Sequence, residues 1–141
     1  MAPSDHTIAN VDGFIESISQ SLNAASKNDC LITLGIKPNR PDTGYGYIQH
    51  TEYVLNTDTD LHKVKTFTEK PNLELAKSFI QSGDFLWNAG IFIWSAKSIL
   101  KSFEKHLPDM YEIFNLGRSE MNTDREKNFI NNAYLQCTNI S

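Results

Sequence analysis

The longest wholly apolar run of the chain covers only Ala89–Trp94. A run of this length cannot span a bilayer, which requires about 20 apolar residues. Successive side chains of a strand point to opposite faces, so a strand over this run would bury both of its faces. The sequence therefore predicts that Ala89–Trp94 is a central strand of a sheet with covered faces.

The rest of the chain alternates between helical and extended patterns, which predicts an α/β fold. Apolar side chains recur at helical spacing over residues 11–25, and Cys30–Gly35 has the composition of a buried strand. Extended segments are expected over Tyr47–Asn56 and His62–Thr68, paired around a polar turn at 57–60. Further helices are expected to begin at Pro71-Asn72, after Ser95, at Pro108, and at a capping box formed by Thr123 and Glu126.

Composition and charge exclude several classes of partner. The 141 residues are 40% hydrophobic, enough for one domain with its own core, and the net charge is −4. Lys and Arg form no run longer than two residues, so neither nucleic acid nor an anionic membrane is an expected partner. The first residues lack the pattern of a secretory signal, and Cys30 and Cys137 lack metal-type spacing. We therefore expect a cytoplasmic protein with two reduced thiols.

Glu69-Lys70-Pro71 is the first candidate site, at the end of an expected strand and just before an expected helix. Open α/β sheets place ligands at such strand ends. Lys70 offers a positive charge and three donors to a phosphate, and Glu69 can accept hydrogen bonds from sugar hydroxyls. Pro71 is expected to hold Lys70 in an extended conformation. The alternative for these residues alone is a solvated charge pair in a turn.

Three further motifs could contact a ligand. In Thr43–Ile48, Gly44 and Gly46 flank Tyr45, so a ligand could approach the backbone closely beside an aromatic ring; the alternative is a plain glycine-rich turn. Asn88 stands at the head of the apolar run, where its amide needs partners that sugar hydroxyls would supply, unless it only caps a turn. Asp5, next to His6, could hold Mg²⁺ together with phosphate oxygens, although alone the pair is a weak signal.

The order of these motifs resembles that of the mannose-1-phosphate guanylyltransferases, a family of the sugar nucleotidyltransferase superfamily. The blocks that carry the resemblance are Asp5-His6, Arg40–Ile48, Phe67–Pro71 and Phe85–Phe92, and the likeness extends over essentially the whole chain. It implies the central part of a Rossmann-like, GT-A-like mixed sheet flanked by helices. It also implies roles for the candidate residues: metal binding for Asp5, the border of the sugar for Tyr45 and Gly46, sugar hydroxyls for Glu69, the sugar phosphate and catalysis for Lys70, and a further sugar contact for Asn88.

The same resemblance implies an activity. The family transfers GMP from GTP to mannose 1-phosphate in the presence of Mg²⁺, which gives GDP-mannose and pyrophosphate. The family's glycine-rich nucleotide-binding loop and its second metal-binding carboxylate have no counterpart in the sequence. We therefore expect residues 1–141 to be a partial nucleotidyltransferase domain, truncated at both ends and without the N-terminal nucleotide-binding segment. Such a piece should be inactive alone and should self-associate through exposed sheet edges.

Two other functions remain open on the sequence. Glu69-Lys70-Pro71 fits a nucleotidyltransferase for another hexose 1-phosphate equally well, although Trp87–Gly90 fits it less well. A non-catalytic domain that binds sugar phosphates, or that serves in protein interactions, would also explain a chain without a nucleotide-binding loop.

Overall fold

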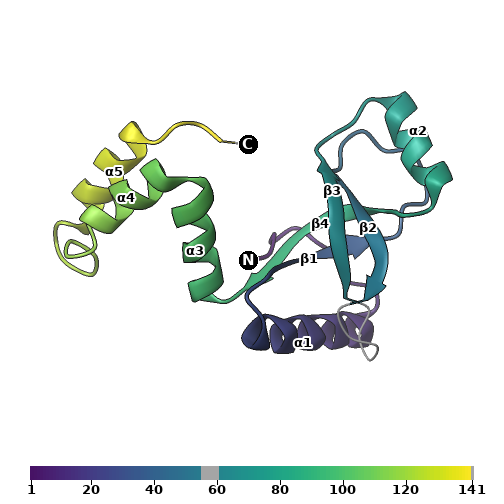
Figure 1. Cartoon of the computed structure of the whole chain (residues 1–141), viewed down its shortest axis with the longest axis horizontal. Helices are drawn as coiled ribbons and strands as arrows, with labels where there is room; N and C mark the ends of the chain where they lie inside the picture. Colours follow the sequence, from purple (N-terminus) through teal and green to yellow (C-terminus); the bar gives the residue numbers. More distant parts are fainter. Residues whose placement is uncertain (55–60, 141) are drawn as a thin grey trace. The chain divides into compact units, whose positions relative to one another are not determined.

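The computed structural model describes residues 1–54 and 61–140 (Figure 1). Contacts divide the chain into two compact units, Met1–Trp94 and Ser95–Ser141. The first unit contains a sheet and two helices, and the second contains three helices. The polar turn expected at 57–60 lies outside the described residues.

The sheet of the first unit has four strands: β1 (Leu31–Ile36), β2 (Tyr47–Val54), β3 (His62–Thr68) and β4 (Phe85–Trp94). Their order across the sheet is β1-β4-β2-β3, and each neighbouring pair is antiparallel. Strand β4 thus has a neighbour on each edge, as the apolar run predicted, and β2 pairs with β3 as expected. The α/β class is confirmed, with β1 and β3 as the edges of the described sheet.

Side chains of β4 alternate between buried and half-buried positions from Phe85 to Trp94. The prediction that both faces of the apolar run are buried is therefore wrong. The buried positions, which are the odd-numbered ones, supply both core clusters. Helix α1 (Val11–Lys27) contributes Ala25 to one cluster, and helix α2 (Leu73–Ser82) contributes Ala76 to the other.

Helices α1 and α2 begin at capping residues that the sequence indicates. The side chain of Asn10 accepts a hydrogen bond from the Gly13 amide at 3.1 Å, and that of Asn72 accepts one from the Leu75 amide at 2.9 Å. Each cap satisfies one of the amide donors that the first turn of a helix leaves unpaired. Helix α2 ends where Gly83 adopts a left-handed conformation with φ +80°, which glycine adopts without strain.

The second unit consists of α3 (Ala96–His106), α4 (Pro108–Leu116) and α5 (Glu126–Gln136). Ser95 caps α3, as expected, with its hydroxyl 3.0 Å from the Ser98 amide. The capping box predicted for α5 is wrong, because the helix starts at Glu126 itself and the Glu126 carboxylate accepts from the Asn122 amide at 2.6 Å. None of the helices in the described ranges combines the length and apolarity that a membrane crossing requires.

A bulge interrupts β4 directly after Asn88, one of the candidate site residues. Thr33 pairs with Phe92 and Gly35 pairs with Asn88, so Ala89–Ile91 lie opposite a single residue of β1. The amide oxygen of Asn88 accepts hydrogen bonds from the Thr33 hydroxyl at 2.8 Å and from the Gly90 amide at 3.1 Å. Gly90 has φ +69°, a left-handed conformation that costs other residues free energy. The Asn88 side chain therefore stabilises the bend of the central strand.

We predict that Gly90→Ala lowers the free energy of unfolding by about 1–2 kcal/mol, because an L-residue is strained at this φ. A Cβ at Gly90 would lie 3.5 Å from the nearest atom outside its chain neighbours, the Pro3 Cγ, so steric overlap adds little. Gly90→Asn is the control, since Asn tolerates the left-handed region better. Urea denaturation followed by circular dichroism should rank the stabilities Gly above Asn above Ala. Equal stability of the three proteins would contradict the assignment.

Candidate functional site

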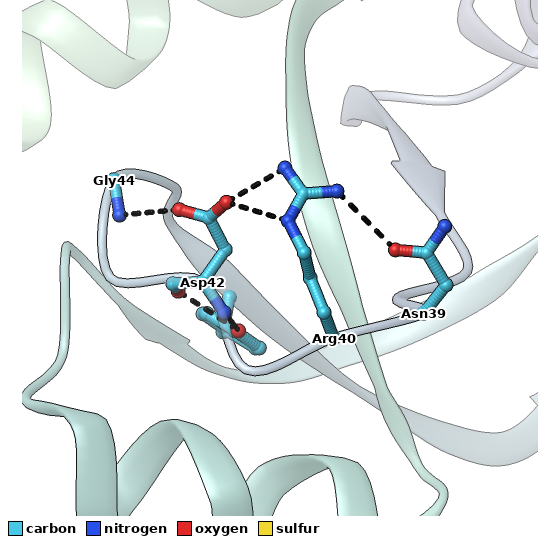
Figure 2. Close-up of polar contacts among 5 residues, drawn as sticks. Asn39, Arg40, Asp42 and Gly44 are labelled. Atoms are coloured by element: carbon cyan, nitrogen blue, oxygen red, sulfur yellow. Dashed lines mark hydrogen bonds and ion pairs between the residues drawn. The ribbon is translucent and has the colours of Figure 1, made fainter.

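Asp42 is the centre of a hydrogen-bond network in the loop between β1 and β2 (Figure 2). Its Oδ2 accepts from the Arg40 Nε at 3.1 Å and from the Arg40 Nη2 at 2.8 Å, so the guanidinium binds one carboxylate oxygen through two nitrogens. Its Oδ1 accepts from the Gly44 amide at 2.8 Å, a bond that folds the chain into a local turn. The Arg40 Nη1 donates to the Asn39 side chain at 3.4 Å. The carboxylate thereby connects both halves of the loop.

The backbone of Asp42 is bound separately by the phenol of Tyr47. The hydroxyl donates to the Asp42 carbonyl at 2.9 Å and accepts from the Asp42 amide at 3.1 Å. Tyr47 is fully buried, and its ring lies 5.3 Å from that of Phe79 in helix α2. The loop is therefore anchored to the core through the backbone of Asp42, while the Asp42 side chain joins Arg40 and Gly44 within the loop.

Trp87 of β4 is a platform for the same loop. The ring of Tyr45 lies 5.0 Å from the Trp87 ring, and the guanidinium carbon of Arg40 lies 5.2 Å from its centroid. An arginine at this distance from an indole is attracted by its π electrons. Trp87 is 7% exposed, and its indole nitrogen has no hydrogen-bond partner within the described part of the chain.

Hydrogen bonding keeps the pKa of Asp42 below its ordinary value. The bond from the Gly44 amide is the largest cause, and the bond and charge of Arg40 add to it. Both contacts stabilise the ionised carboxylate. Partial desolvation acts in the opposite direction. Asp42 is thus an anion throughout the neutral and mildly acidic range, and the network is intact there.

Gly46 is the point at which three of the predicted site residues meet. Its carbonyl accepts from the backbone N–H of Asn88 at 2.8 Å, which joins the loop to β4. A Cβ at Gly46 would lie 2.7 Å from a carboxylate oxygen of Glu69 and 3.2 Å from the Phe67 ring. The absence of a side chain therefore lets the Glu69 carboxylate approach the backbone of the loop.

Lys70 differs from its prediction. Its Nζ lies 3.5 Å from a Glu69 carboxylate oxygen, and both side chains are more than half exposed. Its φ is +41°, so the extended conformation expected before Pro71 is wrong. Such a backbone is uncommon for a non-glycine residue and is strained, and strain of this kind concentrates at ligand-binding sites. Lys70 lies in the short connection between the end of β3 at Thr68 and Asn72, the residue that caps α2.

The N-terminal segment that carries Asp5 lies beside β4 at Met1 and Pro3. Met1 exchanges two backbone hydrogen bonds of 2.9 Å with Phe92, and the nearest atom to a Cβ at Gly90 would be the Pro3 Cγ. The segment therefore runs along β4 from Phe92 toward Asn88. Asp5 follows and is exposed. In the described residues, no group of three or more His, Cys, Asp or Glu side chains could hold a metal ion.

The structure therefore gathers Gly46, Glu69 and Asn88, with Tyr45 and Lys70 beside them. Sequence reasoning did not assign roles to Arg40, Asp42 or Trp87. A signal was present, since Asp42 stands two residues before Gly44 in the spacing of a side-chain-capped turn. The contact of Arg40 with Trp87 joins residues separated by about half of the first unit and has no local signal.

Comparison with known proteins identifies the family of the chain. The family model described as "Nucleotidyl transferase" matches residues 1–133. The chain therefore belongs to the nucleotidyl transferase family, a family of enzymes.

Its relatives include proteins of the type that the sequence resembles. The mannose-1-phosphate guanylyltransferase of Escherichia coli K12 is 36% identical over 137 residues, which is 94% of this chain and 28% of that protein. The mannose-1-phosphate guanylyltransferase of Sinorhizobium fredii is 40% identical over 108 residues, or 77% of this chain and 20% of that protein. The resemblance is thus confirmed, and the chain spans between 20% and 29% of the curated relatives it matches.

Two solved structures share the fold of this chain. A Thermus thermophilus structure titled mannose-1-phosphate geranyltransferase superimposes with a TM-score of 0.76 and 28% identity, over 92% of this chain and 36% of that one. A Helicobacter pylori structure titled mannose-6-phosphate isomerase has a TM-score of 0.69 and 32% identity, over 79% of this chain and 40% of that one.

We predict that ¹³C NMR titration places the pKa of the Asp42 carboxyl below 3.8, its ordinary value. In Arg40→Ala the pKa should rise but stay below 3.8, because the Gly44 amide is the larger cause. Since the pKa is lower in the folded chain than in the unfolded one, the stabilisation is present above 3.8 and is lost as the pH falls through the folded-state value. Arg125→Ala, which breaks the Arg125–Glu120 pair in the second unit, should leave the titration unchanged. A pKa above 3.8 in the unmodified chain would contradict the network.

Proposed function

We propose that the protein carrying this chain transfers GMP from GTP to mannose 1-phosphate, with GDP-mannose and pyrophosphate as products, and that this chain binds the sugar phosphate. The observation that carries the proposal is the approach of the Glu69 carboxylate to Gly46, whose carbonyl accepts from the Asn88 backbone amide, with the ammonium of Lys70 3.5 Å from the same carboxylate. A carboxylate that suits sugar hydroxyls is thus adjacent to an ammonium that suits a phosphate, and the Asn88 backbone is joined to the same loop. The names of the relatives agree with it.

Glu69 and Asn88 would divide the recognition of the sugar. The Glu69 carboxylate accepts hydrogen bonds and its side chain is 56% exposed, so it suits sugar hydroxyls, which donate. The amide oxygen of Asn88 is already occupied by Thr33 and Gly90. We therefore assign the Asn88 Nδ2 as a donor to a hydroxyl oxygen, with Tyr45 bordering the sugar.

Lys70 would bind the phosphate. Its ion pair with Glu69 is exposed, and such pairs contribute little to stability, so the ammonium can turn to a phosphate at small cost. In the reaction a phosphate oxygen of the sugar attacks the α-phosphorus of GTP, and pyrophosphate leaves. The protein's part is to align the reactants and to offset negative charge, and alignment can contribute on the order of 7–11 kcal/mol.

Asp5 would be this chain's ligand to Mg²⁺. Mg²⁺ prefers oxygen ligands and is commonly held by one or two carboxylates, with water and phosphate oxygens as the others, so an exposed aspartate suits it. When bound, the ion would neutralise charge on the phosphates. His6 is unsuited as a ligand for so hard a cation.

Lys70→Ala in the full-length gene product should weaken mannose 1-phosphate binding about 10–100-fold, which corresponds to losing a charge-assisted hydrogen bond. Calorimetry should measure the affinity and pyrophosphate release the turnover. Lys70→Gly should lose the same affinity but melt higher than Lys70→Ala, because glycine relieves the strain at φ +41°. Lys77→Ala, at an exposed position of α2, is the control.

The outcomes separate the candidate functions. Unchanged affinity and turnover in Lys70→Ala would refute the assignment. A preference of the intact enzyme for another hexose 1-phosphate would indicate a different nucleotidyltransferase. Binding without pyrophosphate release would indicate a non-catalytic sugar-phosphate domain. Residues 1–141 alone should release no pyrophosphate.

Gly46→Ala should reduce mannose 1-phosphate affinity with little change in melting temperature. The added methyl must displace the Glu69 carboxylate, which lies at the end of a flexible side chain, while the Phe67 ring has to move only slightly. Gly44→Ala is the matched control, because a Cβ there would meet only the Asp42 Oδ1, at 3.2 Å. If the two variants bind the sugar phosphate equally well, the approach of Glu69 to Gly46 is irrelevant to binding.

A further inference from the structure

The Arg40–Asp42 pair has more contacts than an ordinary surface ion pair. Arg40 is 57% exposed and Asp42 is 25% exposed, and a pair at such positions normally adds little stability. Yet Arg40 binds the carboxylate through two nitrogens and also lies over Trp87, while Asp42 binds the Gly44 amide and the Tyr47 phenol. The network spans the whole turn that leads to Gly46.

The contacts form a continuous connection from Arg40 to the candidate site. Asp42 fixes Gly44, and the next residue, Tyr45, packs on the same Trp87 ring that Arg40 covers. Trp87 immediately precedes Asn88, whose backbone N–H donates to the Gly46 carbonyl. The Arg40 guanidinium and the Tyr45 ring therefore both contact Trp87, which lies in the central strand.

We propose that Arg40 and Asp42 are positioning residues, which act through Trp87 and Tyr45 to hold the Tyr45-Gly46 turn against Glu69 and Asn88 before the sugar phosphate arrives. This inference rests on the proposed function of the site. Its physical basis is preorganisation, because a turn that is already ordered loses less conformational freedom on binding. If only about a tenth of the molecules kept the turn in place, the apparent affinity would fall about tenfold.

The alternative is that Arg40 binds the phosphate directly, and Asp42→Asn separates the two roles. The substitution removes the anion that holds Arg40 but leaves the arginine charge in place. Direct binding predicts that Asp42→Asn keeps or strengthens sugar-phosphate affinity, since a competing carboxylate is gone. Positioning predicts that Asp42→Asn and Arg40→Ala weaken affinity to similar extents. Asp42→Ala should weaken it more, because it also removes the acceptor for the Gly44 amide.

The experiment is a double-mutant cycle on Arg40 and Asp42 in the full-length gene product, with mannose 1-phosphate as the probe in calorimetry. Each single change should weaken binding about 3- to 30-fold, and the double variant should be little weaker than either, because both break one unit. Arg40→Lys should not rescue binding, since an ammonium can neither bind through two nitrogens nor stack as guanidinium does. In kinetics, KM for the sugar phosphate should rise more than kcat falls.

Fluorescence of Trp87 in a Trp94→Phe background gives a readout that does not need substrate. Arg40→Ala and Asp42→Asn should both shift the emission to longer wavelength as the loop loosens over the indole. The control variants Arg125→Ala and Glu120→Gln, which break an ion pair of 2.7 Å in the second unit, should change neither the emission nor the affinity.

The outcomes are distinguishable from a failure of the proposed function. If the unmodified protein binds no mannose 1-phosphate, the function fails, and an unchanged emission spectrum in both variants would then overturn the positioning role independently. If the protein binds, then unchanged or tighter binding by Asp42→Asn, or fully additive losses in the cycle, overturns it.

Discussion

Trp87 lies in the middle of the sheet, paired with Tyr47 on one side and Ile36 on the other. Those two pairings fix the neighbours of β4, and the ring that projects from this position supports the loop that crosses between them. The same residue therefore serves the packing of the strand and the shape of the candidate site. Asn88 follows Trp87 directly. Any shift of Trp87 along the strand would therefore move both the ring that supports the loop and the Asn88 backbone N–H that binds Gly46.

Local patterns predicted most of the elements. Apolar spacing and capping residues placed α1 and α2, and the run from Ala89 placed the central strand, because these features depend on neighbours only three or four residues away. The pairing of β2 with β3 followed from their proximity in the chain. The sequence also singled out Gly46, Glu69 and Asn88 as candidate site residues from their types and positions.

Features that depend on distant contacts were not predictable in this way. The extended conformation expected for Lys70 follows from Pro71 alone, whereas the observed left-handed backbone reflects the passage from β3 into α2. The bulge opposite β1 requires knowledge of strand register, and the contact of Arg40 with Trp87 requires the loop and β4 to be adjacent. The family resemblance supplied the roles of individual residues, which spacing and composition did not establish.

The oxygen and the nitrogen of the Asn88 side-chain amide have different roles. Its oxygen holds the bend of the central strand together through Thr33 and Gly90, so the residue is constrained even without a ligand. Under the proposed function, a substitution of Asn88 made to alter sugar preference would also disturb the backbone of the strand. Under the proposed function, substitutions that change sugar selectivity should therefore be tolerated better around Tyr45, which lies in a loop, than in the central strand.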